Sequence, residues 1–323
     1  MTGEYTISIE SPRLSYEITV NRKYTFVQGD SGTGKTRFAE CLLSDTEYYK
    51  ISCSVPVYVI PNASLFEDYV AKPSDKECIL IIDENACSSF YRNDKCHEFA
   101  KLSFNMSAYF ILITRLNFTT IPYSPESIFI FENIGKGNKL INKAVKRYTW
   151  EDDIDVMLPD SIIVEDLKAG YKFYKNTLSC DVVTADGNSN IPDKIIEEAD
   201  KRRKNIFVIG DGAGIGPHIR NIIREKKALE EQGRNVKLFF PESFEYLVLL
   251  ALLGGVKELT QTYDYADSQT YKSWEDYYTK LLRHVTERYG GYKKGVLPNY
   301  LKGRKFITKF YKNIEDLDKS CIR

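Results

Sequence analysis

The chain has 323 residues, enough for two domains of ordinary size. Hydrophobic residues make up 43% of it, which is typical of folded globular proteins and excludes a disordered chain. Lysine plus arginine equals aspartate plus glutamate at 45 each, so the net charge indicates no class of partner.

The cysteines and the apolar segments indicate a cellular compartment. The seven cysteines are scattered, odd in number and never arranged as Cys-x-x-Cys, which predicts a reducing compartment. The first residues have neither a basic region nor an apolar stretch, so no signal peptide is predicted. The most apolar run, 244–253, is shorter than the about 20 residues needed to span a bilayer, and we expect a buried helix there. These features predict a cytoplasmic protein with no membrane partner.

In the first half of the chain, short strands are expected to alternate with helices. Strands are predicted at 5–9, 16–20, 24–28, 55–60, 78–82, 108–114 and 128–131. Helices are predicted at 35–43 and 65–70. The runs 78–82 and 108–114 are uninterrupted apolar segments, as expected for central strands of a parallel sheet.

An acidic stretch at 151–160 marks a predicted domain boundary. Beyond it, strands are predicted at 161–164, 180–184, 205–209 and 236–240, and helices at 166–178, 192–204, 218–232 and 242–253. Four strand–helix units in succession predict an α/β fold, a parallel sheet with helices on both faces. The predicted domains are therefore 1–150, 151–260 and a helical, aromatic and basic extension at 261–323.

A glycine-rich loop lies between the strand predicted at 24–28 and the helix predicted at 35–43. It fits the P-loop pattern Gly-x-x-x-x-Gly-Lys-Ser/Thr through Gly29, Asp30, Ser31, Gly32, Thr33, Gly34, Lys35 and Thr36. Backbone N–H groups of such a loop cradle phosphate oxygens. Lys35 is expected to reach the β and γ phosphates, and Thr36 to hold magnesium. The cofactors predicted are Mg²⁺ and ATP, since no Asn-Lys-x-Asp motif for guanine is present.

Two acids end the apolar strand at 78–82, as in a Walker B motif. Asp83 is expected to hold Mg²⁺ through water, and Glu84 to polarise the attacking water. Paired acids favour hydrolysis over kinase chemistry, because hydrolysis needs an activated water. Thr114, at the end of the next strand, is a candidate sensor of the γ-phosphate. Arg115 is a sensor, an arginine finger acting in trans, or a surface residue.

These motifs resemble a compact AAA-type ATPase core over residues 1–145. The short spacing between Thr36 and Asp83, and the lack of a Leu-Ser-Gly-Gly-Gln signature, make an ABC-type core a poorer match. The resemblance implies an N-terminal P-loop NTPase domain with a mostly parallel sheet. A small-molecule kinase is a weaker alternative, disfavoured by the paired acids and by the lack of an arginine-rich lid.

In the second half, acids follow two of the predicted strands. Glu165 follows 161–164, Asp211 follows 205–209, and a Phe-Glu pair at Phe244 and Glu245 comes after the last strand. This pattern resembles the TOPRIM fold of primases, topoisomerases and nucleases of phage defence, including those of the overcoming-lysogenization-defect type. The resemblance, over residues 160–255, implies that Glu165, Asp211 and Glu245 hold Mg²⁺ for phosphodiester cleavage.

Two departures from the TOPRIM pattern weaken this metal site. Ala213 stands where the second Asp of an Asp-x-Asp pair is expected, and Asp166 replaces the glycine after the first acid. Fewer carboxylates bind a divalent ion less tightly. A catalytically inactive, structural TOPRIM-like domain is therefore an alternative. A dinucleotide-binding loop at 210–216 is disfavoured, because its glycines do not give Gly-x-Gly-x-x-Gly.

Basic and aromatic residues alternate near the C-terminus without an intervening acid. The basic residues are Lys293, Lys294, Lys302, Arg304, Lys305, Lys309 and Lys312; the aromatic residues are Tyr289, Tyr292, Tyr300, Phe306, Phe310 and Tyr311. Basic groups pair with phosphates and aromatic rings stack on bases, so a nucleic-acid partner, DNA or RNA, is predicted. The alternatives are a solvated helix face above core aromatics, and an acidic partner protein.

We therefore expect an ATPase whose nucleotide state controls a TOPRIM-like domain. In one version, that domain cleaves nucleic acid in phage defence, with Glu165 and Asp211 as catalytic residues. In the alternative, it is inactive, and the protein is an ATP-driven sensor or assembly scaffold that recruits or releases a partner effector protein. A homo-oligomer is also expected.

Overall fold

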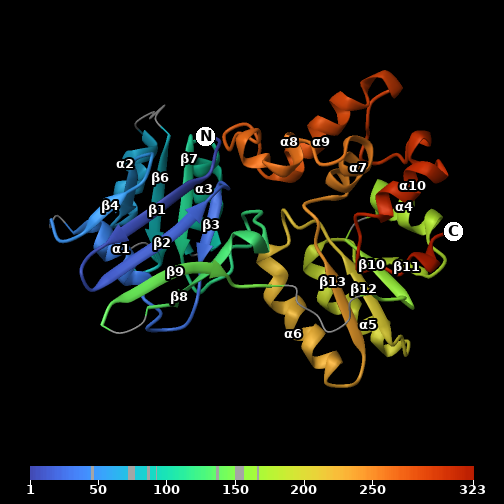
Figure 1. Ribbon diagram of the computed structural model, residues 1–323, viewed down its shortest axis with the longest axis horizontal. Helices are drawn as coiled ribbons and strands as arrows, with labels where there is room; N and C mark the ends of the chain where they lie inside the picture. The colour runs from blue at the N-terminus through green and yellow to red at the C-terminus, as the bar shows by residue number, and fades with distance from the viewer. Residues whose placement is uncertain are drawn as a thin grey trace. The chain divides into compact units, whose positions relative to one another are not determined.

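The computed structural model has an α/β architecture, with strands and helices alternating along the chain (Figure 1). It describes residues 1–44, 47–71, 77–85, 88–91, 93–135, 138–149, 156–165 and 167–323. The chain divides into two compact units. The first unit comprises Met1–Thr149 and Gln261–Ser273, and the second comprises Trp150–Thr260 and Trp274–Arg323.

This division differs from the three consecutive domains expected from the sequence. The chain enters the second unit near residue 150, returns to the first at 261 and leaves it again after 273. The expected C-terminal extension at 261–323 is therefore divided between both units. We call the returning stretch, 261–273, the return segment.

The described part of the first unit contains a nine-stranded, mostly parallel sheet in the order β4-β1-β2-β9-β8-β3-β7-β6-β5. Its strands are β1 (Tyr5–Glu10), β2 (Leu14–Val20), β3 (Tyr24–Val27), β4 (Lys50–Ser52), β5 (Val57–Ile60), β6 (Cys78–Asp83), β7 (Ala108–Ile113), β8 (Ile128–Asn133) and β9 (Leu140–Lys146). Its α-helices are α1 (Lys35–Leu43), α2 (Ala63–Ala71) and α3 (Asn93–Phe104). The sequence had not predicted β4, β9 or α3.

Parallel pairing of β5, β6, β7, β3 and β8 positions the candidate site. Every residue of β6 and β7 is buried, which confirms that these apolar runs are central strands. On β7, Ile111 belongs to the same core cluster as Phe38 of α1. The neighbouring residue, Phe110, instead packs against Phe66 of α2 and Phe99 of α3. Because neighbouring strand residues point to opposite faces, α1 and the α2–α3 pair cover different sides of the sheet.

The described part of the second unit contains a four-stranded parallel sheet in the order β11-β10-β12-β13. Its strands are β10 (Ser161–Val164), β11 (Asp181–Thr184), β12 (Asn205–Ile209) and β13 (Asn235–Phe239). Its α-helices are α4 (Ala169–Thr177), α5 (Ile191–Asp200), α6 (Ile219–Glu230), α7 (Phe244–Leu253), α8 (Lys257–Thr260), α9 (Trp274–Val285) and α10 (Arg304–Tyr311). The strand–helix alternation expected from the sequence is confirmed here.

Helix α7 is the apolar run at 244–253. Ser243 caps it by accepting a hydrogen bond from the N–H of Tyr246, and Gly254 ends it. Leu247, Val248 and Leu249 are buried, as expected of a core helix. Among the described residues, no helix combines the length and apolar character needed to cross a membrane.

Candidate functional site

The P-loop connects β3 to α1 at the carboxyl edge of the first sheet. Gly34 precedes α1 with a φ of 81°, in the left-handed region that favours glycine. A Cβ added there would lie 2.7 Å from the hydroxyl of Tyr16, which itself donates to the Gly34 carbonyl. Both the backbone conformation and the space therefore require glycine at this position.

Lys35 directs its ammonium group back into the loop. Its Nζ donates to the carbonyls of Gly29 at 2.7 Å and Asp30 at 2.6 Å, and to the hydroxyl of Thr33 at 3.0 Å. Burial lowers the pKa of Lys35, and the nearby charge of Arg115 lowers it further. The ammonium group is therefore held by acceptors of the glycine-rich loop itself.

Asp83 ends β6, is 4% exposed, and lies in the neighbourhood of Thr36. Its Oδ1 accepts from the N–H of Asn85 at 2.8 Å, and Asn85 Nδ2 donates to Thr36 Oγ1 at 3.3 Å. Asp83 Oδ2 is buried and has no hydrogen-bond partner within the described part of the chain. A buried carboxylate oxygen without a partner fits a Mg²⁺ site, because Mg²⁺ prefers oxygen ligands.

Glu84 follows β6, and residues that follow the neighbouring strand β7 hold its side chain. Its Oε2 accepts from the hydroxyl of Thr114 at 3.0 Å and from the N–H of Arg115 at 2.7 Å. The Thr114 hydroxyl also accepts from the N–H of Leu116. Both of these contacts involve Oε2 of Glu84.

The structure thus gathers the residues predicted for the first site. They come from three sources: the P-loop after β3, the acids that close β6, and the residues after β7. All three follow parallel strands at the carboxyl edge of the sheet, where ligands of open α/β sheets bind. The sequence analysis missed Asn85, although its position directly after the two acids was a usable signal.

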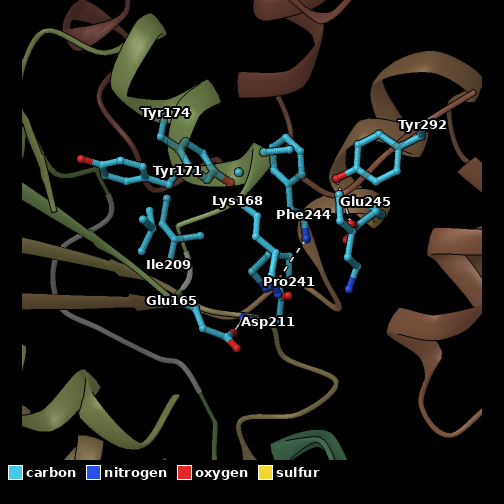
Figure 2. Close-up of a pocket in the computed structure, with 14 residues that line it drawn as sticks. Glu165, Lys168, Tyr171, Tyr174, Ile209, Asp211, Pro241, Phe244, Glu245 and Tyr292 are labelled. Carbon is cyan, nitrogen blue, oxygen red and sulfur yellow. Dashed lines mark hydrogen bonds between the residues drawn. The ribbon is translucent and has the colours of Figure 1, made fainter. Parts of the chain in front are cut away.

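In the second unit, Glu165 and Asp211 follow the central strands β10 and β12. Glu165 Oε2 accepts from the N–H of Asp211 at 2.9 Å, and Asp211 Oδ1 accepts from the N–H of Phe244 at 3.1 Å. Figure 2 shows these carboxyl groups close together at the base of a pocket. The pocket is about 30 Å³ in volume, room for a few waters at most.

Glu245 lies elsewhere in the same pocket. It is 3% exposed, and its Oε1 accepts from the hydroxyl of Tyr292 at 3.0 Å. Burial raises the pKa of Glu245. In Figure 2 its side chain points toward Tyr292 and away from Glu165.

The three-carboxylate metal site predicted for the second unit is not assembled. Within the described ranges, no group of three or more His, Cys, Asp or Glu residues is placed to hold a metal ion. Glu165 and Asp211 come together, but Glu245 does not join them. Ala213 is 3% exposed, and its N–H donates to the Glu242 carbonyl, so its side chain supplies no ligand. The described residues of this pocket therefore do not make up the divalent-ion site of the TOPRIM pattern.

Lys294, from the basic C-terminal stretch, also lines this pocket. Its ammonium group forms an ion pair with Glu275 in the first turn of α9. Burial lowers the pKa of Lys294, but the charges of Glu275 and Glu245 outweigh burial and raise it above its usual value. The sequence analysis had placed Lys294 and Tyr292 among candidate nucleic-acid contacts, and the structure places both in the pocket.

The other aromatic residues of that stretch are largely core residues. Phe310 and Tyr311 are fully buried, and Phe310 packs 4.6 Å, centroid to centroid, from Phe173 of α4. Tyr289, by contrast, is 74% exposed. The basic residues that remain exposed are Lys293, Lys302, Arg304, Lys305, Lys309 and Lys312. These residues form an exposed basic set above core aromatics, so phosphate contacts are available but stacking by Phe310 or Tyr311 is not.

The six described cysteines are free thiols. Asp166, the other departure from the TOPRIM pattern, lies outside the described residues. Comparison with protein families and with curated proteins finds no match to this chain. Its function is therefore inferred from the geometry of the two sites.

Proposed function

We propose that the first unit binds and hydrolyses ATP with Mg²⁺. The observation that carries the proposal is the position of Glu84, held by Thr114 and the N–H of Arg115 at the sheet edge that also bears Lys35. A carboxylate fixed beside a phosphate-binding loop is suited to orient a water for attack on the γ-phosphate.

The roles follow from the contacts. N–H groups of the P-loop and the Lys35 ammonium bind the phosphates, and the three acceptors that now surround that ammonium give way to phosphate oxygens. Thr36 and Asp83 hold Mg²⁺, which neutralises charge on the phosphates when bound. Glu84 Oε1 accepts a proton from the attacking water, while Thr114 senses whether the γ-phosphate is present.

The second unit is proposed to act under control of that nucleotide. The chain crosses between the units near 150, at 261 and after 273. A rearrangement in the first unit can therefore be transmitted to the second through three covalent connections. Its exposed basic set supports contact with the phosphates of DNA or RNA. Such an ATPase, acting as a homo-oligomer in the cytoplasm, would suit phage defence.

Two versions of the second unit's action differ in chemistry. In the first, Glu165 and Asp211 share a divalent ion and cleave a phosphodiester. In the second, the TOPRIM-like unit only binds, and the protein is a sensor or scaffold for a partner effector. The separate position of Glu245, together with Ala213, favours the second version.

Phosphate release from ATP by the full chain tests the proposed hydrolysis. Changing Glu84 to Gln should slow release by about 10²-fold or more, because the water loses its proton acceptor, while ATP binding is retained. The matched control is Glu98→Gln on α3, an exposed acid paired with Lys95. Hydrolysis by Glu84→Gln at the wild-type rate would contradict the proposal.

A further inference from the structure

A short stretch of the C-terminal region lies across the acidic pocket. We call residues 292–295 the strap. Its first residue, Tyr292, is 2% exposed and donates to Glu245, and its last, Gly295, accepts from the Lys172 ammonium at 2.8 Å. Between them, the carbonyl of Lys294 accepts from the N–H of Ala169 at the start of α4. The strap is therefore tied to α4 and α7 by both side chains and backbone.

The strap brings a positive charge into the pocket. Lys294 forms its ion pair with Glu275 of α9, and it lines the same pocket as Glu245 and Asp211. One ammonium group thus lies at a pocket that these two carboxyl groups also line. A lysine ammonium is a compact point charge with three N–H donors, so it compensates the carboxylates but has no vacant coordination position for a water.

We propose that Lys294 is the built-in cation of this acidic centre, which consequently works without a divalent ion. This inference rests on the proposed TOPRIM-like role of the second unit. Of the two versions of that role, cleavage of nucleic acid and binding without cleavage, it favours binding without cleavage. A divalent ion beside Asp211 would meet the like charge of Lys294. With fewer carboxylates than the TOPRIM pattern, the pocket offers little to offset that repulsion.

Manganese binding to the full chain without nucleotide tests the inference directly. We expect the wild type and Asp211→Asn to bind the same number of Mn²⁺ ions, counted by electron paramagnetic resonance up to about 1 mM metal, where weak protein sites still fill. Any ion held near the P-loop contributes equally to both proteins and cancels. One additional Mn²⁺ per wild-type chain, lost in Asp211→Asn, would overturn the proposal.

Removing the ammonium group of Lys294 provides a second test of the inference. Lys294→Met keeps much of the side-chain length but removes the ion pair with Glu275 and the positive charge at the pocket that Glu245 and Asp211 line. This variant should gain a Mn²⁺ site that disappears again when Asp211→Asn is added. Lys293→Met, which changes the exposed neighbouring lysine, is the matched control and should gain none. A folded Lys294→Met protein that gains no such site would show that the ammonium does not exclude the ion.

Failure of this inference and failure of the ATPase proposal are distinguishable. Phosphate release from ATP is measured on the same wild-type sample. Absence of hydrolysis together with equal Mn²⁺ counts for the wild type and Asp211→Asn would refute the ATPase and leave the built-in cation standing. Hydrolysis of ATP together with an Asp211-dependent Mn²⁺ ion would support the ATPase proposal and refute the built-in cation. The wild-type count remains decisive even if Lys294→Met fails to fold.

Discussion

Among single residues, Asp83 gives the strongest support to the proposed Mg²⁺ site. Its carboxylate is nearly fully buried, and Oδ2 has no partner among the described residues. Leaving such a buried group unsatisfied costs about 1–3 kcal/mol, and more when it is charged. Asn85 fixes the other oxygen and also contacts Thr36, so the two proposed magnesium-binding residues are aligned before nucleotide arrives.

The role of Asn85 can be measured separately from that of the ligands. In Asn85→Ala the link between Asp83 and Thr36 is lost, and the Mg²⁺ concentration for half-maximal ATP hydrolysis should rise about 10-fold, as for other residues that orient ligands. Asn21→Ala, an exposed asparagine that contacts Glu4, is the control and should behave as wild type. An unchanged Mg²⁺ requirement in Asn85→Ala would remove this residue from the site.

Among the elements, the return segment is attached to the first unit by a buried lysine. Lys23, just before β3, is 6% exposed and donates to the carbonyls of Phe104, Met106 and Ser268. The first two carbonyls lie between α3 and β7, and the third belongs to the return segment. Burial lowers the pKa of Lys23 to about 7, with the charge of Asp267 acting in the opposite direction.

This pKa predicts a pH dependence of stability with a definite sign. Between about pH 7 and 10.5, the unfolded chain binds more protons at Lys23 than the folded chain does, so the free energy of unfolding rises with pH. Compared with Lys23→Met, the wild type should gain up to about 1.4 kcal/mol per pH unit in this range, measured by urea unfolding. The exposed Lys101→Met control should follow the wild type. A wild-type advantage over Lys23→Met that is constant with pH would contradict the assignment.

Local sequence patterns predicted much of the fold and part of the sites. Apolar runs identified β6 and β7. The fixed spacing of the glycine-rich loop predicts roles for Lys35 and Thr36, because that signal also lies in consecutive residues. The partnership of Lys294 with Glu245 and Glu275 was not predictable, since it joins segments distant in the sequence. The alternation of basic and aromatic residues in α10 was also ambiguous, because a buried helix face and a stacking surface share that pattern.

The whole molecule consists of two compact units, the first with the proposed nucleotide site and the second with Lys294 at its acidic pocket. The connection between the units is more than a single linker, because the chain leaves the first unit twice and returns to it once, through the return segment. We expect ATP binding at Lys35 to favour one arrangement of the first unit, and a ligand that favours one arrangement shifts the population of a connected part as well. In this proposal the nucleotide acts as a switch for the second unit.

Hydrogen–deuterium exchange with and without ATP and Mg²⁺ tests that claim most directly. The Glu84→Gln protein is used so that nucleotide stays bound, and Lys35→Ala serves as the control that cannot hold it. Protection should change in the second unit, including the strap and β12, as well as around the P-loop, and Lys35→Ala should show neither change. Exchange differences confined to 1–149 and 261–273 would contradict the account.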